Sequence, residues 1–134
     1  MKPALLDSDT ISYFFKGNPI VIQKVDSYLQ AHGFAYLSVV TYYEVLNGLL
    51  FKDAKSQLSR FQQFVQLNQV LPVTLQIAAT GAQIFAGLRK ANQMIGHNDV
   101  LIGATAIEHD LILVTNNTSH FSRIQSLVLD NWAI

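Results

Sequence analysis

The sequence predicts an α/β protein in which helices cover both faces of a mainly parallel sheet. Short apolar runs recur between longer segments of helical period, as expected when parallel strands alternate with covering helices. Half of the 134 residues are hydrophobic and the mean hydropathy is +0.25, which is enough apolar material for one core. We therefore expect one three-layer domain spanning residues 1–134, without linker or repeat.

The predicted strands are short and apolar, and turn-forming residues such as Gly, Pro and Asn separate the predicted elements. We expect strands at residues 4–6, 34–37, 70–73 and 111–114, with 127–129 as a candidate edge strand. The ligands of such a sheet sit beyond the carboxyl ends of its strands, near the point where the strand order reverses. That edge of the sheet is where we look for function.

The predicted helices follow from apolar periodicity and from capping residues. The first runs to Phe15 with Ser8 or Asp9 as its cap, and a second closes at His32-Gly33. Others are expected at residues 39–50, after Asp53 as an N-cap, and at 75–94 and 100–108, the last capped by Asn98 or Asp99. Residues 115–119 are expected to form a loop.

Composition excludes several classes of protein. The chain has no cysteine, which rules out disulfide scaffolds, thiolate zinc sites, iron–sulfur clusters and cysteine nucleophiles. Nine basic and nine acidic residues give no global field for nucleic acid. The uncharged stretch 61–88 is rich in Gln and Asn and contains Pro72, so we expect no membrane span. The N-terminus is not that of a secretory signal, and we expect a cytoplasmic protein.

Three acids stand at informative positions in this weakly charged sequence. Asp7 directly follows an apolar strand, Glu44 is the only charged residue between Phe34 and Phe51, and Asp99 opens an apolar helix. Each also has an ordinary explanation: Asp7 and Asp99 as helix caps, Glu44 as part of a solvated face. If the three converged, they would repel each other unless a hard divalent cation neutralised them.

Oxygen ligands without sulfur or paired histidines favour Mg²⁺ or Mn²⁺ over zinc. Such a cation polarises a phosphate and activates water, so the predicted reaction is phosphodiester hydrolysis. Lys16, the Arg89-Lys90 pair and the group Lys52, Lys55 and Arg60 are candidates for holding flanking phosphates, and ordinary solvated side chains are the alternative.

Four segments together resemble the PIN-domain ribonucleases, and specifically the VapC toxins of VapBC toxin–antitoxin pairs. Their order, spacing and total length fit across essentially the whole chain. The segments are Leu5-Leu6-Asp7-Ser8-Asp9-Thr10, Leu37 to Gly48 with Glu44 at its centre, Asn98-Asp99-Val100-Leu101-Ile102-Gly103-Ala104-Thr105-Ala106, and Leu113 to Phe121 with Thr115-Asn116-Asn117.

The resemblance implies a five-stranded parallel sheet and a metal site. Asp7, Glu44 and Asp99 would be the metal-binding and catalytic acids, with Asp9 and Thr115 in support. Asn117 and His120 stand where many relatives have acids, so the resemblance leaves the fourth ligand and a second metal undecided. Asn117 can still coordinate through its carbonyl or through water.

By the same resemblance, the activity would be Mg²⁺-dependent endoribonuclease cleavage, with tRNA or another structured RNA as the target and arrest of translation as the result. A VapB-type antitoxin would neutralise the protein by blocking the site, and the toxin would be a homodimer. A non-catalytic PIN-like module that binds RNA or protein is one alternative. A haloacid-dehalogenase-like phosphatase is a weaker one, because only Arg123 and Asp130 carry charge after Thr115.

Overall fold

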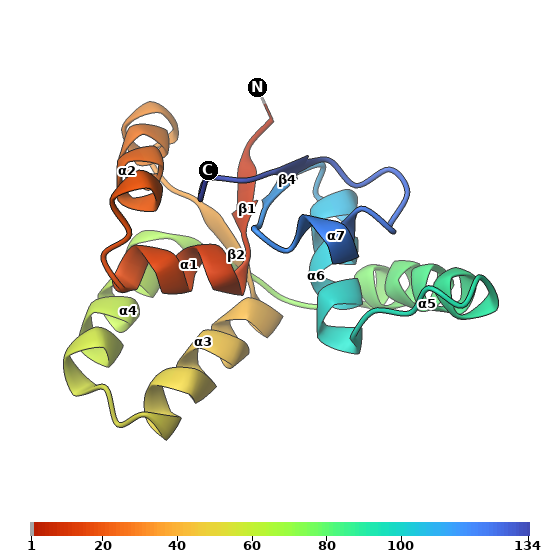
Figure 1. The fold of residues 1–134 in the computed structure, drawn as a ribbon, viewed down its shortest axis with the longest axis horizontal. Helices are drawn as coiled ribbons and strands as arrows, with labels where there is room; N and C mark the ends of the chain where they lie inside the picture. Colours follow the sequence, from red (N-terminus) through yellow and green to blue (C-terminus); the bar gives the residue numbers. More distant parts are fainter. Residues whose placement is uncertain (1) are drawn as a thin grey trace.

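Five parallel strands form one sheet in the computed structural model, which describes residues 2–134, and their order is β3-β2-β1-β4-β5 (Figure 1). Each strand is only two or three residues long. Their bounds are β1 Ala4–Leu6, β2 Tyr36–Ser38, β3 Gln69–Leu71, β4 Ile112–Val114 and β5 Leu129–Asp130. The parallel α/β architecture predicted from the alternating pattern is confirmed.

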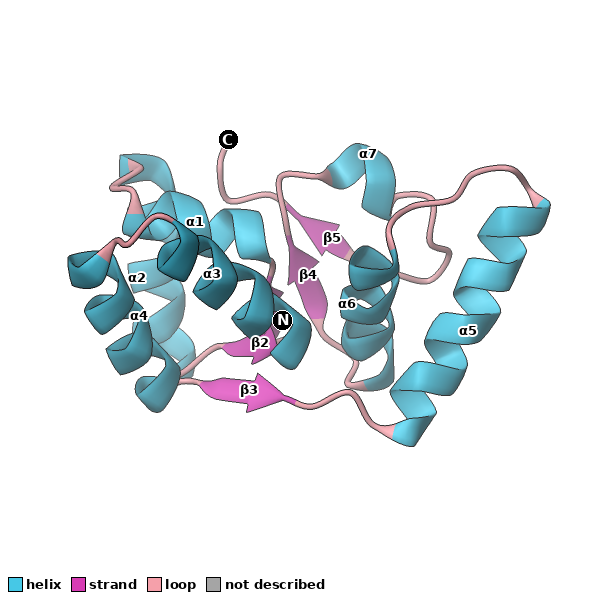
Figure 2. Cartoon of the chain, turned by 90° about the horizontal axis from the view of Figure 1, so that it is seen from below, coloured by secondary structure: helices cyan, strands magenta, loops and turns pink. Residues whose placement is uncertain are grey.

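Helices cover the sheet on both faces, with α1 to α4 on one side and α5 to α7 on the other (Figure 2). Their bounds are α1 Ser8–Phe15, α2 Pro19–His32, α3 Val39–Phe51, α4 Lys55–Leu67, α5 Leu75–Lys90, α6 His97–Glu108 and α7 Thr118–Phe121. None of these helices in residues 2–134 combines the length and apolar character needed to cross a membrane.

The core is divided in two by the sheet because neighbouring strand residues point to opposite faces. Leu6 packs with Ile11 and Phe61 under α1 to α4, whereas Leu5 packs with Ile102 under α5 to α7. All five of these side chains are almost completely buried. Two apolar layers therefore fix β1 at the centre of the sheet.

The strand order reverses beside β1, and this reversal positions the polar residues that follow the strands. The chain builds β2 and β3 on one side of β1 and then crosses to β4 and β5 on the other. Leu6 pairs with Val114, so Asp7 and Thr115 emerge side by side from β1 and β4. The crevice expected at a switch point thus begins at Asp7.

The predicted helix starts are wrong at three places, since local sequence offers several capping residues and the tertiary structure selects one. Asp7, not Ser8 or Asp9, caps α1 by accepting a hydrogen bond from Ser8 N. The cap of α6 is Gly96, which leaves Asp99 inside the first turn. Asp53 adopts a φ of 52° and Ala54 precedes α4 instead.

Several predicted boundaries also shift. The helix predicted at 75–94 ends at Lys90, and α7 forms at Thr118–Phe121, where a loop was expected. The strands predicted at 34–37, 70–73 and 127–129 lie one or two residues away, because their bounds depend on pairing partners such as Leu5 with Tyr36. Short strands carry too little sequence signal to fix their own ends.

Candidate metal centre

Asp7 is a carboxylate buried at the carboxyl end of the central strand. Its side chain belongs to a residue only 5% exposed, and it accepts hydrogen bonds from Ser8 N and from Thr115 Oγ1, both at 2.8 Å. The bond to Ser8 N caps α1, so the capping explanation for Asp7 is correct as far as it goes. Capping does not explain the second contact, in which Asp7 Oδ2 accepts a hydrogen bond from Thr115, the residue that follows β4.

Thr115 connects Asp7 to Asp9. Its hydroxyl lies 2.8 Å from Asp7 Oδ2 and 3.4 Å from Asp9 Oδ2, and it accepts a hydrogen bond from Asn117 N. Asp9 Oδ2 also accepts from Asn116 N at 3.0 Å. Because a hydroxyl has one proton to donate, the shorter contact assigns it to Asp7. The strand-end segment thus orients both acids.

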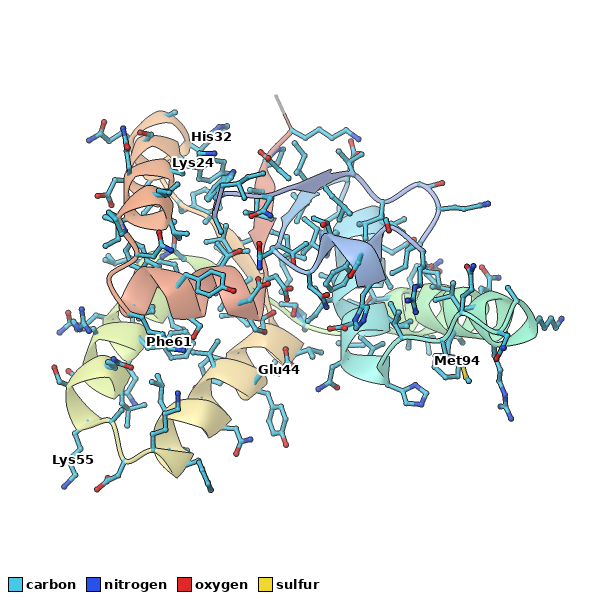
Figure 3. The ribbon with its side chains drawn as sticks, in the orientation of Figure 1. Lys24, His32, Glu44, Lys55, Phe61 and Met94 are labelled. Carbon is cyan, nitrogen blue, oxygen red and sulfur yellow. The ribbon has the colours of Figure 1, made fainter. Side chains whose placement is uncertain are left out.

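Glu44 projects from α3 and is held from two sides (Figure 3). Its Oε1 accepts a hydrogen bond from Ser8 Oγ at 2.6 Å, and its Oε2 accepts a long one from Asn98 Nδ2 at 3.4 Å. Ser8 and Asn98 were not among the predicted site residues. Both directly neighbour a predicted acid in the sequence, and this adjacency is the signal that could have identified them.

Asp99 lies on α6 with a side chain 25% exposed, close to the segment after β4. His120 Nδ1 is 4.0 Å from Asp99 Oδ2 and 3.1 Å from Asn117 Nδ2. Asn117 and His120 are therefore neighbours of Asp99. They bring an amide and an imidazole to this edge of the site.

The electrostatics show that the four carboxylates act on one another. Burial raises the pKa of Asp7 to about 7, with further contributions from the charge of Asp9 and then of Asp99, against the hydrogen bonds from Thr115 and Ser8. Burial also raises the pKa of Asp99, and the charge of Glu44 adds to that effect. In residues 2–134, no Lys or Arg forms an ion pair with any of the four acids.

The donor chemistry fits a hard divalent cation. The site offers carboxylate, hydroxyl and amide oxygens, and Asp7 is buried without a basic partner, a costly arrangement that a bound cation relieves. As placed in residues 2–134, no three acidic or histidine side chains converge closely enough to share one ion. Charge and shared neighbours thus couple the predicted acids at one edge of the sheet, without drawing them to one point.

The predicted basic residues fall on two different surfaces. Lys16 lines a cavity that also contains Asp9 and Glu44. Arg89 and Lys90 line a separate groove between α5 and α6, together with His97. Lys16 and Lys52 therefore share a cavity with site acids, whereas Arg89 and Lys90 do not.

Comparison with known proteins identifies the fold and its family. Residues 4–127 match the PIN domain. The chain therefore belongs to the PIN-domain family, which removes the basis for the phosphatase alternative.

Relatives of similar length carry the name of one group within that family. The chain is 30% identical over 129 residues to ribonuclease VapC2 of Haemophilus influenzae, covering 96% of both proteins. It is 26% identical to a chain in the DNA-bound VapBC structure from Salmonella typhimurium, with a TM-score of 0.87 over 98% of this chain and 99% of that one. VapBC-1 from nontypeable Haemophilus influenzae gives 26% identity and a TM-score of 0.85, covering 98% of each chain. The resemblance to VapC toxins inferred from the four motifs is confirmed.

Proposed function

We propose that this protein is a metal-dependent endoribonuclease toxin that hydrolyses RNA phosphodiester bonds. The observation that carries the proposal is the buried Asp7 carboxylate, whose pKa is raised by burial and by the charges of Asp9 and Asp99 and which pairs with no Lys or Arg in residues 2–134. A carboxylate whose pKa is raised by burial and by neighbouring acids is a candidate for a functional role. The relative from Haemophilus influenzae is named a ribonuclease, which supports the same activity.

In this proposal Asp7, Glu44 and Asp99 hold Mg²⁺ or Mn²⁺ and are the catalytic acids. Lewis-acid activation of the phosphodiester and of water is the chemistry that such a cation supplies when bound. The chain's own groups keep the acids in place: Thr115 donates to Asp7, and Ser8 donates to Glu44.

Three other polar side chains border these acids and support the site. Asp9 Oδ2 lies 3.4 Å from the Thr115 hydroxyl that donates to Asp7, and His120 with its partner Asn117 lies beside Asp99. Polar neighbours of metal-binding groups tune their orientation and basicity, which is the role we propose for these three.

The substrate we propose is tRNA or another structured RNA in the cytoplasm, whose cleavage inhibits translation. Lys16 and, more remotely, Arg89 and Lys90 would contact phosphates flanking the cut. The neutral net charge of the chain is compatible with this proposal because a bound cation places positive charge at the phosphate itself.

The partners we propose are a VapB-type antitoxin and a second copy of the chain. Structures similar to this one are named as VapBC assemblies, which supports the antitoxin. Val39 and Tyr43 lie four residues apart on α3 and are 38% and 62% exposed, so this helix offers an apolar surface to another chain.

Cleavage of a mixed tRNA pool by the purified protein tests the activity. Discrete fragments should form with Mg²⁺ or Mn²⁺ and disappear with EDTA. The variants Asp7→Asn and Asp99→Asn, purified in parallel, should be folded and inactive, which also controls for contaminating ribonucleases. Full activity in both variants would refute the roles assigned to these acids.

A non-catalytic binding module is the second candidate, and one observation favours it. Asn117 and His120 place an amide and an imidazole at the edge of the site. This edge therefore carries less negative charge than it would with acids at both positions. If the folded wild-type protein binds RNA and Mn²⁺ but produces no fragments from any RNA pool, this candidate replaces the nuclease.

A further inference from the structure

A cavity of about 280 Å³ lies between α1, α3 and the start of α4 and opens beside the acids. Asp9 and Glu44 line it at the acidic site, and Phe15, Val45 and Leu49 give it an apolar wall. Its volume is near the lower limit of ligand pockets, roughly 300 Å³. The space therefore suits a small part of a substrate.

Gly48 keeps this cavity open. The residue lies within α3, where glycine makes a helix less stable than alanine does, and its φ is not in the left-handed region that favours glycine. A Cβ built at Gly48 meets no atom within 4 Å, so no packing contact requires the glycine. Because Gly48 lines the cavity, a larger side chain at this position would fill it.

The cavity changes from acidic to basic along its length. Lys16 follows the end of α1 and Lys52 follows the end of α3, and both line the cavity. The two helices begin at the sheet edge and run toward the same side of the molecule (Figure 1). Lys16 comes seven residues after Asp9 and Lys52 eight after Glu44, a helical rise of roughly 10–12 Å.

This distribution of charge matches an RNA strand whose reacting phosphate lies at the acids. The neighbouring phosphate would extend toward the two lysines, and the base between them would contact the apolar wall. Ser12 and Gln57, which also line the cavity, offer hydrogen-bonding groups to the edge of a base.

We propose that the cavity between α1 and α3 is a nucleotide subsite, which holds the nucleotide next to the bond that is cut. The inference rests on the proposed ribonuclease function and deepens it. In this arrangement Gly48 provides the space, Phe15 and Leu49 the apolar contact, and Lys16 and Lys52 the phosphate contacts.

The test fills the cavity without disturbing the acids. Gly48→Leu places a side chain in the open space, and Gly87→Leu is the matched control, because Gly87 lies in α5 and a Cβ there also meets nothing within 4 Å. Binding of a fluorescent single-stranded RNA of randomised sequence is measured by anisotropy with Ca²⁺ in place of Mg²⁺, because this hard cation keeps positive charge at the acids but is a weaker Lewis acid, so that hydrolysis is slowed. We expect Gly48→Leu to lower the affinity by at least about fivefold and the control to leave it unchanged.

The lysines give a second, independent measurement. Lys16→Ala and Lys52→Ala should each reduce the slope of log affinity against log salt by about 0.7, the value for one phosphate contact on a single strand. Lys24→Ala is the control, since Lys24 lies on α2 and does not line the cavity (Figure 3). Its slope should equal that of the wild type.

These measurements distinguish failure of the subsite proposal from failure of the ribonuclease proposal. Equal RNA affinity of Gly48→Leu and Gly87→Leu, in a wild type that cuts RNA, overturns the subsite alone. A wild type that neither binds nor cuts RNA overturns both proposals. A Gly48→Leu protein with normal RNA affinity that fails to bind the antitoxin shows a protein-docking cavity and also overturns the subsite. If Gly48→Leu melts below the wild type, Gly48→Ala should still lower the affinity at least about twofold.

Discussion

Replacing Asp7 by asparagine should stabilise the metal-free protein, and more strongly as the pH rises. The neutral amide keeps the essential contacts: its Oδ1 can accept from Ser8 N, and its Nδ2 can donate to Thr115 Oγ1, whose proton can then turn to Asp9 Oδ2. What the substitution removes is a buried negative charge beside other acids.

The magnitude follows from the pKa of Asp7, which rises from 3.8 to about 7 on folding. Between these values the native protein holds a proton that the unfolded chain releases, so ionisation of Asp7 costs stability as the pH rises through this window. Three pKa units correspond to about 4 kcal/mol at pH 8. Below pH 4 the wild type and Asp7→Asn should therefore differ little, and at pH 8 the variant should be more stable by up to about 4 kcal/mol.

Urea unfolding of both proteins in EDTA at several pH values measures this difference, and the comparison cancels the titration of groups they share. Saturating Mg²⁺ should then stabilise the wild type, by about 2.7 kcal/mol at one hundred times the dissociation constant, and leave Asp7→Asn unchanged. If the free energies of unfolding of the two proteins changed with pH in parallel, folding would not raise the pKa of Asp7.

Two further substitutions test contacts around the site. Thr115→Val should destabilise the protein by about 1–3 kcal/mol, because the buried Asp7 and Asn117 N each lose a hydrogen-bond partner. Thr115→Ser keeps the hydroxyl and should retain most of the stability. Chemical denaturation compares the two variants, and equal stability would contradict the assigned hydrogen bonds. Gly103→Ala should cost about 1–3 kcal/mol, because its Cβ would lie 2.8 Å from Ile124 Cδ1, whereas Gly87→Ala should gain up to about 1 kcal/mol. A melting temperature for Gly103→Ala at or above the wild-type value would show that the Cδ1 end of the Ile124 side chain turns aside at little cost.

The predicted helices were recovered where a long apolar period defined them. Examples are the segments that form α2, α3 and α5, whose buried faces repeat at helical spacing. The start of α1 was predicted wrongly because Asp7, Ser8 and Asp9 are all good caps, and the residue that caps the helix is the one whose backbone leaves β1. Propensity alone cannot choose between adjacent capping residues.

The acids of the candidate site were identifiable because they interrupt apolar sequence in a chain with few charges. Their neighbours Ser8 and Asn98 were not predicted as site residues, since serine and asparagine are common at any helix start. Only the approach of α1 and α6 to α3 shows that both bond to Glu44.

Apolar periodicity and charge are local properties of a chain, so they predict the α/β class, the helical segments and the three acids Asp7, Glu44 and Asp99. Folding sets the strand bounds, the caps, the raised pKa of Asp7 and the cavity at Gly48. Each of these depends on residues distant in sequence: a pairing strand, a neighbouring acid, or the space left between two helices. Burial and proximity arise only when the chain is folded, and they give a common carboxylate its chemistry.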